Sequence, residues 1–151
     1  MTCDVAGKKL LIECKRPMTE AGARSRIRQA MKTIDREAKL EKPGTRGVLA
    51  MSITKLINPG DAIFSGTNEA DARVGLNDLV RRKATELSGV WSRSGTKVVG
   101  IMFYVITPAF LEDRKILALQ QRTNGYGLAP EGSADLQAFK GLMSSLEKVW
   151  Y

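Results

Sequence analysis

Two kinds of apolar pattern alternate along this chain, and this alternation constrains its fold more than any other feature. Residues 47–54 and 97–107 are continuous apolar runs of strand length, which is typical of strands buried on both faces of a sheet. Residues 19–40, residues 68–92 and the segment from Ser133 onward repeat apolar residues at spacings of three and four, which indicates amphipathic helices. Helices that alternate with buried strands predict an α/β fold, in which the helices pack on the sheet.

A hairpin at the start of the chain makes the predicted sheet mixed rather than purely parallel. Thr2–Val5 and Lys9–Lys15 have the composition of two short strands separated by a turn at 6–8. Later in the chain, residues 116–120 are predicted to form either an edge strand or a loop, and residues 124–127 (NGYG) a turn. This turn is not expected to bind phosphate, because it lacks the strand-to-helix context and the lysine of a phosphate-binding loop.

The length and composition fit one compact domain that spans residues 1–151. The chain is 43% hydrophobic and 26% charged, and no apolar run approaches the roughly 20 residues of a membrane-spanning helix. Its first residues lack the pattern of a signal peptide. Two cysteines, Cys3 and Cys14, are too few for a disulfide framework or a zinc ribbon. We therefore expect a soluble cytoplasmic protein that has no contact with a membrane.

The chain contains no histidine, and this excludes several classes of enzyme. Ser-His-Asp and Cys-His catalysis, HExxH metal sites and histidine-based nucleases all require an imidazole. Any catalysis by this chain has to use carboxylates, lysine, tyrosine or a hard metal ion.

Positive charge is concentrated in the first part of the chain. The net charge is +8, and residues 1–57 hold 13 Lys and Arg against 6 Asp and Glu, whereas residues 58–151 hold 11 against 10. A local excess of this kind predicts a surface that contacts a polyanion, most commonly nucleic acid. A basic face that is merely solvated is the alternative explanation.

One cluster near the start of the chain has a composition suited to catalysis. Asp4 lies in the first predicted strand, and Glu13 and Lys15 close the second. A two-residue loop at 7–8 would place Asp4 opposite Leu11. Directly opposed residues share a face, so Asp4 would lie on the same side as Glu13 and Lys15. The α-carbons of Asp4 and Glu13 would then be diagonal neighbours, about 7–8 Å apart.

Two carboxylates beside a lysine are suited to a magnesium ion, which prefers oxygen ligands and keeps several of its waters. Asp4 and Glu13 would ligate the ion, with help from the main-chain carbonyl of Cys14. Manganese can take the place of magnesium in such oxygen sites. Lys15 would orient the attacking water, whose pKa the metal lowers. The cluster is thus predicted to hydrolyse phosphodiester bonds without histidine.

The same residues carry a resemblance to a known nuclease superfamily. Asp4, followed by an apolar run and then by Glu13-Cys14-Lys15, resembles the bipartite motif of the PD-(D/E)XK nucleases. The helix and the strand predicted next match the order of that superfamily's core, so the resemblance covers about the first 57 residues. It implies a restriction-endonuclease-like fold and a magnesium-dependent endonuclease that cleaves DNA. It also implies that Asp4 and Glu13 are metal ligands and that Lys15 is the catalytic lysine.

The core of that superfamily has a helix and part of a strand before the first aspartate, whereas only three residues precede Asp4 here. The restriction-endonuclease-like core would then lack its N-terminal helix. Three explanations stay open. The chain is the C-terminal part of a larger nuclease, or a homodimer partner or larger partner completes the fold, or the C-terminal helix does so.

Four basic residues near the cluster are predicted to contact nucleic acid. Arg16 directly follows the motif, and Arg24, Arg28 and Lys32 recur every four residues along the predicted helix. They would form a stripe that binds phosphate and positions DNA without reading its sequence. Three alternatives stay open: a catalytically inactive nuclease-type fold that binds nucleic acid or protein, a basic interaction module unrelated to nucleases, and a surface hairpin with an ordinary Glu–Lys pair. The tripeptide Glu-x-Lys does not decide between them, because residues 37–39 repeat it.

Overall fold

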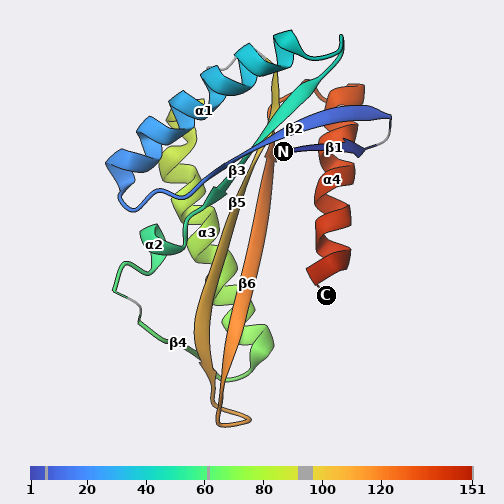
Figure 1. Ribbon diagram of the computed structural model, residues 1–151. Coiled ribbons are helices and arrows are strands. Elements are labelled where there is room, and N and C mark those ends of the chain that lie inside the picture. Colours follow the sequence, from blue (N-terminus) through green and yellow to red (C-terminus); the bar gives the residue numbers. More distant parts are fainter. Residues whose placement is uncertain (6, 61, 92–96, 151) are drawn as a thin grey trace.

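The structure is a computed structural model that describes residues 1–5, 7–60, 62–91 and 97–150. In these residues six strands form one curled mixed sheet, with long helices on both of its faces (Figure 1). The strands are β1 (Thr2–Val5), β2 (Lys8–Lys15), β3 (Arg46–Ser52), β4 (Phe64–Gly66), β5 (Val98–Leu111) and β6 (Ile116–Gly127). The helices are α1 (Glu20–Leu40), α2 (Thr54–Ile57), α3 (Glu69–Trp91) and α4 (Ala134–Trp150). The prediction of a mixed α/β fold is confirmed.

The sheet is built around β5, which pairs with three other strands. β2, β3 and β5 run parallel in that order, and β1 adds to β2 as an antiparallel edge strand. β6 pairs with β5 antiparallel, and β4 pairs with the last residues of β5 beyond the end of β3. The opening hairpin therefore makes the sheet mixed, as expected, and β6 contributes a second antiparallel edge.

Each face of the sheet is covered by helices that bury a separate apolar cluster. On one face α1 and α3 pack against alternate strand residues, such as Leu49 and Met51 of β3. On the other face α4 packs against the residues in between, such as Val48 and Ala50. Because both faces are covered, the middle of β3 needs apolar side chains at successive positions, which explains its run from Val48 to Met51.

The helices begin and end close to where the sequence predicts. The Thr19 hydroxyl caps α1 by accepting a hydrogen bond from the Gly22 amide at 3.1 Å. α3 begins at Glu69 and is described to Trp91, so Ser92, its expected last residue, lies outside the described residues, as does Ala6 of the first turn. No helix in the described part of the chain is long and apolar enough to cross a membrane.

β5 is longer than its sequence predicts. Its expected end is Thr107, but the strand continues through Pro108 to Leu111. Proline lacks an amide hydrogen and normally interrupts a central strand. Pro108 lies after Tyr104, the last residue that pairs with β3, and before Ala109, the first that pairs with β4. The missing donor therefore falls where β5 changes neighbours.

β6 occupies a segment where a turn is predicted. The prediction that residues 124–127 form a turn is wrong, and residues 116–120 are the start of the same strand. The glycines allow α4 to approach instead. A Cβ at Gly125 would lie 2.8 Å from Met143 Sδ, and one at Gly127 would lie 2.3 Å from Leu136 Cδ1. Glycine in this strand thus marks close helix packing rather than a turn.

Two ion pairs tie α4 to the strands. Asp135, in the first turn of α4, contacts Arg46 Nε at 2.6 Å and Lys8 Nζ at 3.2 Å. Burial raises the pKa of Asp135, but the hydrogen bonds from Arg46 and Lys8 outweigh this effect, so the pKa lies below its ordinary value. The folded state therefore favours the charged carboxylate.

We expect Asp135→Asn to lower the free energy of unfolding by about 1–2 kcal/mol at neutral pH. Because the folded pKa is the lower one, this contribution is fully present above the unfolded pKa of about 4 and is lost as the pH falls through the folded pKa. Urea denaturation at neutral and at acidic pH measures it. The wild-type protein should lose more stability on acidification than the variant, and equal losses would contradict this role of Asp135.

Candidate functional site

Glu13 and Lys15 lie together at the carboxyl end of β2, on the sheet face that α1 covers. They share this face with the buried Leu11, because side chains alternate along a strand. Lys15 Nζ contacts Glu13 Oε1 at 2.6 Å, and the two side chains are 20% and 24% exposed. The structure thus brings these two predicted site residues together in a partly buried ion pair.

This end of β2 is an open edge of the described sheet. β1 pairs with β2 only as far as Leu11, and the main chain of Met1 continues the pairing to Ile12. Glu13 and Lys15 have β3 on one side, and the described residues place no strand on the other. A polar ligand can therefore approach the ion pair from this edge.

Asp4 does not lie beside Glu13, so the predicted register of the hairpin is wrong. Asp4 pairs with Lys9 rather than with Leu11. Gly7 adopts a φ of +74° and lies in the turn, while Lys8 joins the strand, so the loop ends one residue earlier than predicted. The face of Asp4 is unchanged, but its partner lies four residues before Glu13, about 13 Å along β2. In this pairing the two carboxylates cannot share one ion.

The described residues offer fewer side chains to a metal ion at this edge than the sequence predicts. Cys14 is exposed, and its side chain points to the opposite face from Glu13. Its main-chain carbonyl remains the predicted ligand. In the described part of the chain, no group of three or more acidic or cysteine side chains gathers closely enough to hold a metal ion. A cation at this site would depend on Glu13, main-chain oxygen, water and the phosphate of a substrate.

Arg16 and Arg24 have different surroundings. Arg16 is exposed and follows β2 directly. Arg24 extends from α1 to α3, where its Nη2 donates a hydrogen bond to the main-chain oxygen of Glu86 at 2.9 Å. It also contacts Glu20 at 3.3 Å. Arg24 therefore helps to join two helices, whereas Arg16 is the basic residue nearest in sequence to the ion pair.

Arg28 and Lys32 face solvent on the outer side of α1. Both are exposed, and each lies two residues from the buried Ala30, which is about 200° around the helix. Neither makes an ion pair with any residue that the structure describes. They are available to a polyanion, and they continue the row that begins at Arg24, turning about 40° further from the sheet at each step.

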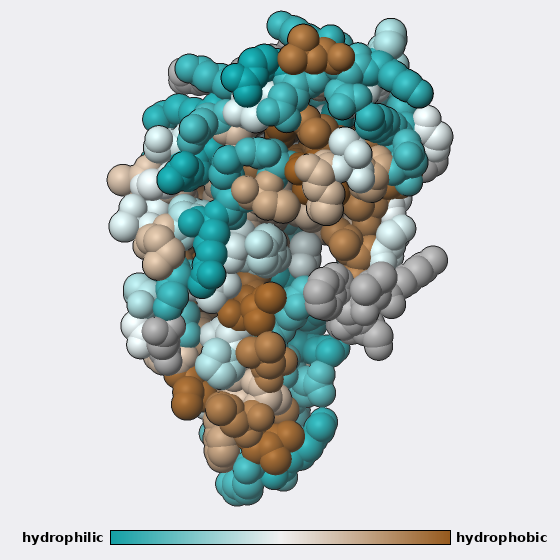
Figure 2. Space-filling model, in the orientation of Figure 1, coloured by the Kyte–Doolittle hydropathy of each residue, from teal (hydrophilic) through white to brown (hydrophobic). Residues whose placement is uncertain are grey.

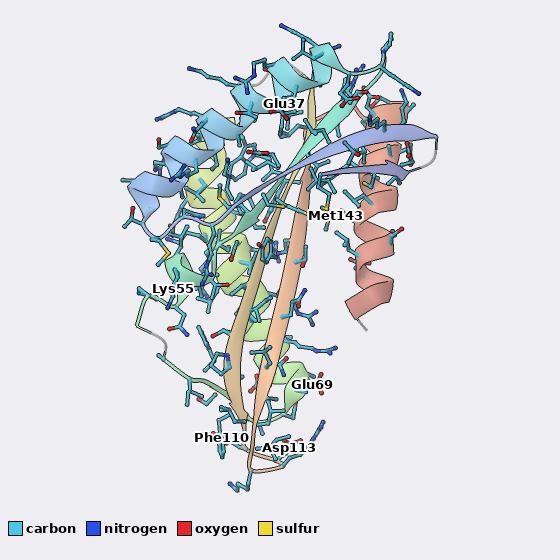
Figure 3. The ribbon with its side chains drawn as sticks, viewed as in Figure 1. Glu37, Lys55, Glu69, Phe110, Asp113 and Met143 are labelled. Carbon is cyan, nitrogen blue, oxygen red and sulfur yellow. The ribbon has the colours of Figure 1, made fainter. Side chains whose placement is uncertain are left out.

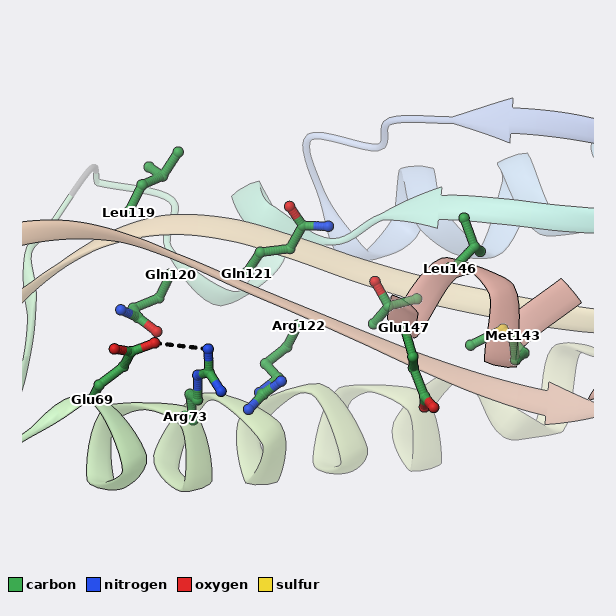
Figure 4. A pocket seen from close by; sticks show the side chains of 10 residues that line it. Glu69, Arg73, Leu119, Gln120, Gln121, Arg122, Met143, Leu146 and Glu147 are labelled. Carbon is green, nitrogen blue, oxygen red and sulfur yellow. Dashed lines mark ion pairs between the residues drawn. The ribbon is translucent and has the colours of Figure 1, made fainter. Parts of the chain in front are cut away.

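Sequence analysis missed a pocket of about 220 Å³ between α3, β6 and α4 (Figure 4). Its charged lining consists of Glu69 and Arg73 from α3, Arg122 from β6 and Glu147 from α4. Arg73 contacts Glu69 at 2.7 Å, while burial and the nearby charge of Arg73 lower the pKa of Arg122. No motif marks this pocket, because three elements far apart in the sequence contribute to it. The polar run from Gln120 to Asn124 is its one sequence signal.

Comparison of this chain with protein-family models, with curated proteins and with solved structures finds no match. The described fold defines the class of protein only as a mixed α/β domain with a curled sheet between helices. Its function has to be inferred from the chemistry of its own side chains.

Proposed function

We propose that the protein is a metal-dependent nuclease that binds nucleic acid, with Glu13 and Lys15 at the centre of its site. The observation that carries this proposal is their ion pair at the open carboxyl end of β2. In the PD-(D/E)XK resemblance these two positions are a metal ligand and the catalytic lysine. The order of hairpin, helix and parallel strand around them supports the same assignment.

The side chains at this edge fit a magnesium site that has a single protein carboxylate. Magnesium is commonly held by one or two carboxylates together with waters and substrate phosphate, and Glu13 supplies one carboxylate. When bound, the ion would polarise the phosphate and lower the pKa of a water. The ammonium of Lys15, 2.6 Å from the Glu13 carboxylate, would hold the attacking water and offset negative charge that develops on the phosphate.

Nuclease activity tests the proposal. We expect the chain to cleave plasmid or single-stranded DNA with magnesium or manganese, as followed by gel electrophoresis. Glu13→Gln and Lys15→Met should each lower the rate by about 100-fold, the usual effect of removing one group that stabilises developing charge. Matched controls are Glu37→Gln and Lys39→Met, which change the second Glu-x-Lys tripeptide, on α1 (Figure 3 labels Glu37).

The controls should cleave at the wild-type rate, and cleavage that survives Glu13→Gln would remove this site from the mechanism. Asp4→Asn distinguishes a site that uses Glu13 alone from the predicted site that uses both Asp4 and Glu13. Because Asp4 lies opposite Lys9, this substitution should leave the cleavage rate unchanged. A loss as large as that of Glu13→Gln would instead require Asp4 at the metal.

Binding of nucleic acid without cleavage is the second candidate function, and the position of Asp4 favours it. Separation of Asp4 from Glu13 leaves one carboxylate where the resemblance implies two. Fluorescence anisotropy with a labelled oligonucleotide over a range of salt concentrations distinguishes the candidates. Arg28→Gln and Lys32→Gln should each reduce the slope of log affinity against log salt by about one. Salt-sensitive binding without cleavage supports the second candidate, and no binding at low salt rejects both.

A further inference from the structure

The outer edge of β6 is the longest strand edge that the described residues leave open. β6 pairs with β5 along all 12 of its residues. On its other side, no strand of the described chain pairs with it. Every second residue of such an edge directs its amide and carbonyl groups outward, so the edge is a template for another extended chain.

Three adjoining pockets follow this edge, with α3 on one side and α4 on the other. The first, of about 220 Å³, spans residues 119–123 of β6. The next, of about 480 Å³, spans 122–124, and the third, of about 610 Å³, spans 123–127. Together they form a groove whose floor is the β6 edge and whose walls are α3 and α4. Figure 4 shows the first pocket, where β6 crosses between the two helices.

The two faces of β6 turn toward different walls of the groove. Arg122 is opposite Val105, and Val105 is buried with the residues of α3. Because opposed residues share a face, Gln120 and Arg122 face α3. The alternate residues, such as Gln121 and Gly125, face α4, as the close approach of Met143 to Gly125 shows.

The walls differ in chemistry. The α3 side is polar, and its lining residues are Glu69, Arg73, Gln120 and Arg122. The α4 side holds the apolar lining residues Leu119, Met143 and Leu146, with Gln121, Thr123 and Glu147 beside them. Apolar side chains also gather over the outer part of the β5–β6 hairpin (Figure 2), where Leu117 is 59% and Leu119 is 72% exposed.

We propose that this groove binds an extended polypeptide segment, which adds to β6 as a further strand. Alternate side chains of an added strand point to opposite sides, so the segment would alternate apolar with polar residues. Its apolar side chains would pack on Leu119, Met143 and Leu146, while its polar side chains would reach Arg73 and Arg122.

The charge of the groove favours acidic residues at the polar positions of the segment. Four cations line it against two carboxylates: Arg73, Arg81, Arg122 and Lys140 against Glu69 and Glu147. Among these, Lys140 also contacts Glu131 at 3.0 Å, so the arginines carry most of the positive excess. A single extended segment fits better than the sheet edge of a second copy, whose own flanking helices would meet α3 and α4. The proposal is independent of the nuclease function, because the groove uses neither Glu13 nor Lys15.

Fluorescence anisotropy with labelled peptides of about nine residues, the length of an ordinary strand, tests the proposal. One peptide alternates Val with Glu, one alternates Val with Lys, and one is the Val-Glu peptide with a central Pro. We expect the Val-Glu peptide to bind and the Val-Lys peptide to bind at least about tenfold more weakly. The Pro peptide should not bind, because it lacks an amide donor and cannot extend the ladder.

A matched pair of leucine variants locates the binding site. Leu119→Ser should weaken binding of the Val-Glu peptide by about tenfold, through loss of one apolar contact. Leu40→Ser replaces another exposed leucine, 83% exposed at the end of α1, and should bind as the wild type does. Circular dichroism checks that both variants fold, and amide NMR shifts should cluster on β6.

Four outcomes would overturn the proposal. They are no binding of the Val-Glu peptide, equal binding of the Val-Lys peptide, unchanged binding by Leu119→Ser, and shifts away from β6. Sedimentation of the protein without peptide measures its oligomeric state and tests whether a second copy occupies the β6 edge. A dimer that already protects the β6 amides from hydrogen exchange would assign the edge to a second copy of the chain, and displacement of the peptide by single-stranded DNA would assign it to nucleic acid.

Discussion

Phe103→Ala is expected to lower the free energy of unfolding by about 3–5 kcal/mol. Phe103 lies in β5 and has no exposed surface. Its ring centroid is 5.3 Å from that of Trp91 and 5.8 Å from that of Tyr126, so it joins the end of α3 to β6 on the face of the sheet that α3 covers. Truncation leaves a cavity lined by the rings of Trp91 and Tyr126 and removes the contacts that the Phe103 ring makes with both. Urea denaturation followed by circular dichroism measures the loss.

Phe110→Ala is the matched control for this prediction. Phe110 lies on the same strand, at the outer end of the β5–β6 hairpin (Figure 3), but its side chain is only half-buried. Its removal should cost clearly less than the removal of Phe103. Equal losses would show that the ring contacts of Phe103 do not hold this part of the core together.

Gly47→Val is expected to destabilise the protein by about 3 kcal/mol, although valine is the better strand former. A Cβ at Gly47 would lie 2.0 Å from Ile34 Cγ2 and 3.2 Å from Ile34 Cβ. Ile34 lies on the buried face of α1, where it has no exposed surface and packs against the sheet, so its branched side chain cannot move aside. The intrinsic preference of valine for strands is worth at most about 1 kcal/mol, whereas overpacking of a core costs about 1–3 kcal/mol. The steric clash therefore outweighs the strand preference, and the substitution lowers the free energy of unfolding.

The double variant Gly47→Val with Ile34→Ala tests the cause. Removal of the Ile34 branch makes room for the new side chain. The double variant should therefore lose less stability than the sum of the losses of the two single variants. Gly75→Ala is the control, since no atom lies within 4 Å of a Cβ there. That change, in the exposed part of α3, should stabilise the protein by about 0.5–1 kcal/mol. Strict additivity of the Gly47 and Ile34 effects would contradict the proposed clash.

Periodicity predicted the long elements well, because burial dictates their patterns. The predicted helix 19–40 differs from α1 by one residue at its start. β3 starts at Arg46, one residue before the predicted start of the strand 47–54. α2 and β4 were not predicted, because elements of four and three residues have no measurable period. In β6 the glycines under α4 carry the same signal as turn glycines, so local composition was misleading there.

The candidate site was predictable only in part. The shared face of Glu13 and Lys15 follows from the period of two in a strand and needs no knowledge of neighbours. The place of Asp4 depends on which residues form the turn. Because Lys8 belongs to β2 and not to the loop, β1 is shifted by two positions along β2, which keeps the face of Asp4 but moves its carboxylate away from Glu13. The β6 groove depends on three elements at once, so no local pattern could predict it.

The central place of β5 has a consequence for how the chain matures. β3 pairs with β5, yet the whole of α3 separates them in sequence. During synthesis β3 leaves the ribosome before β5, so the edge of β3 that pairs with β5 stays unpaired until β5 has been made. Strand pairing between distant segments is slow, so the unit of β2, α1 and β3 passes through synthesis with apolar surface uncovered. We expect this interval to be the one in which the nascent chain is most exposed to aggregation.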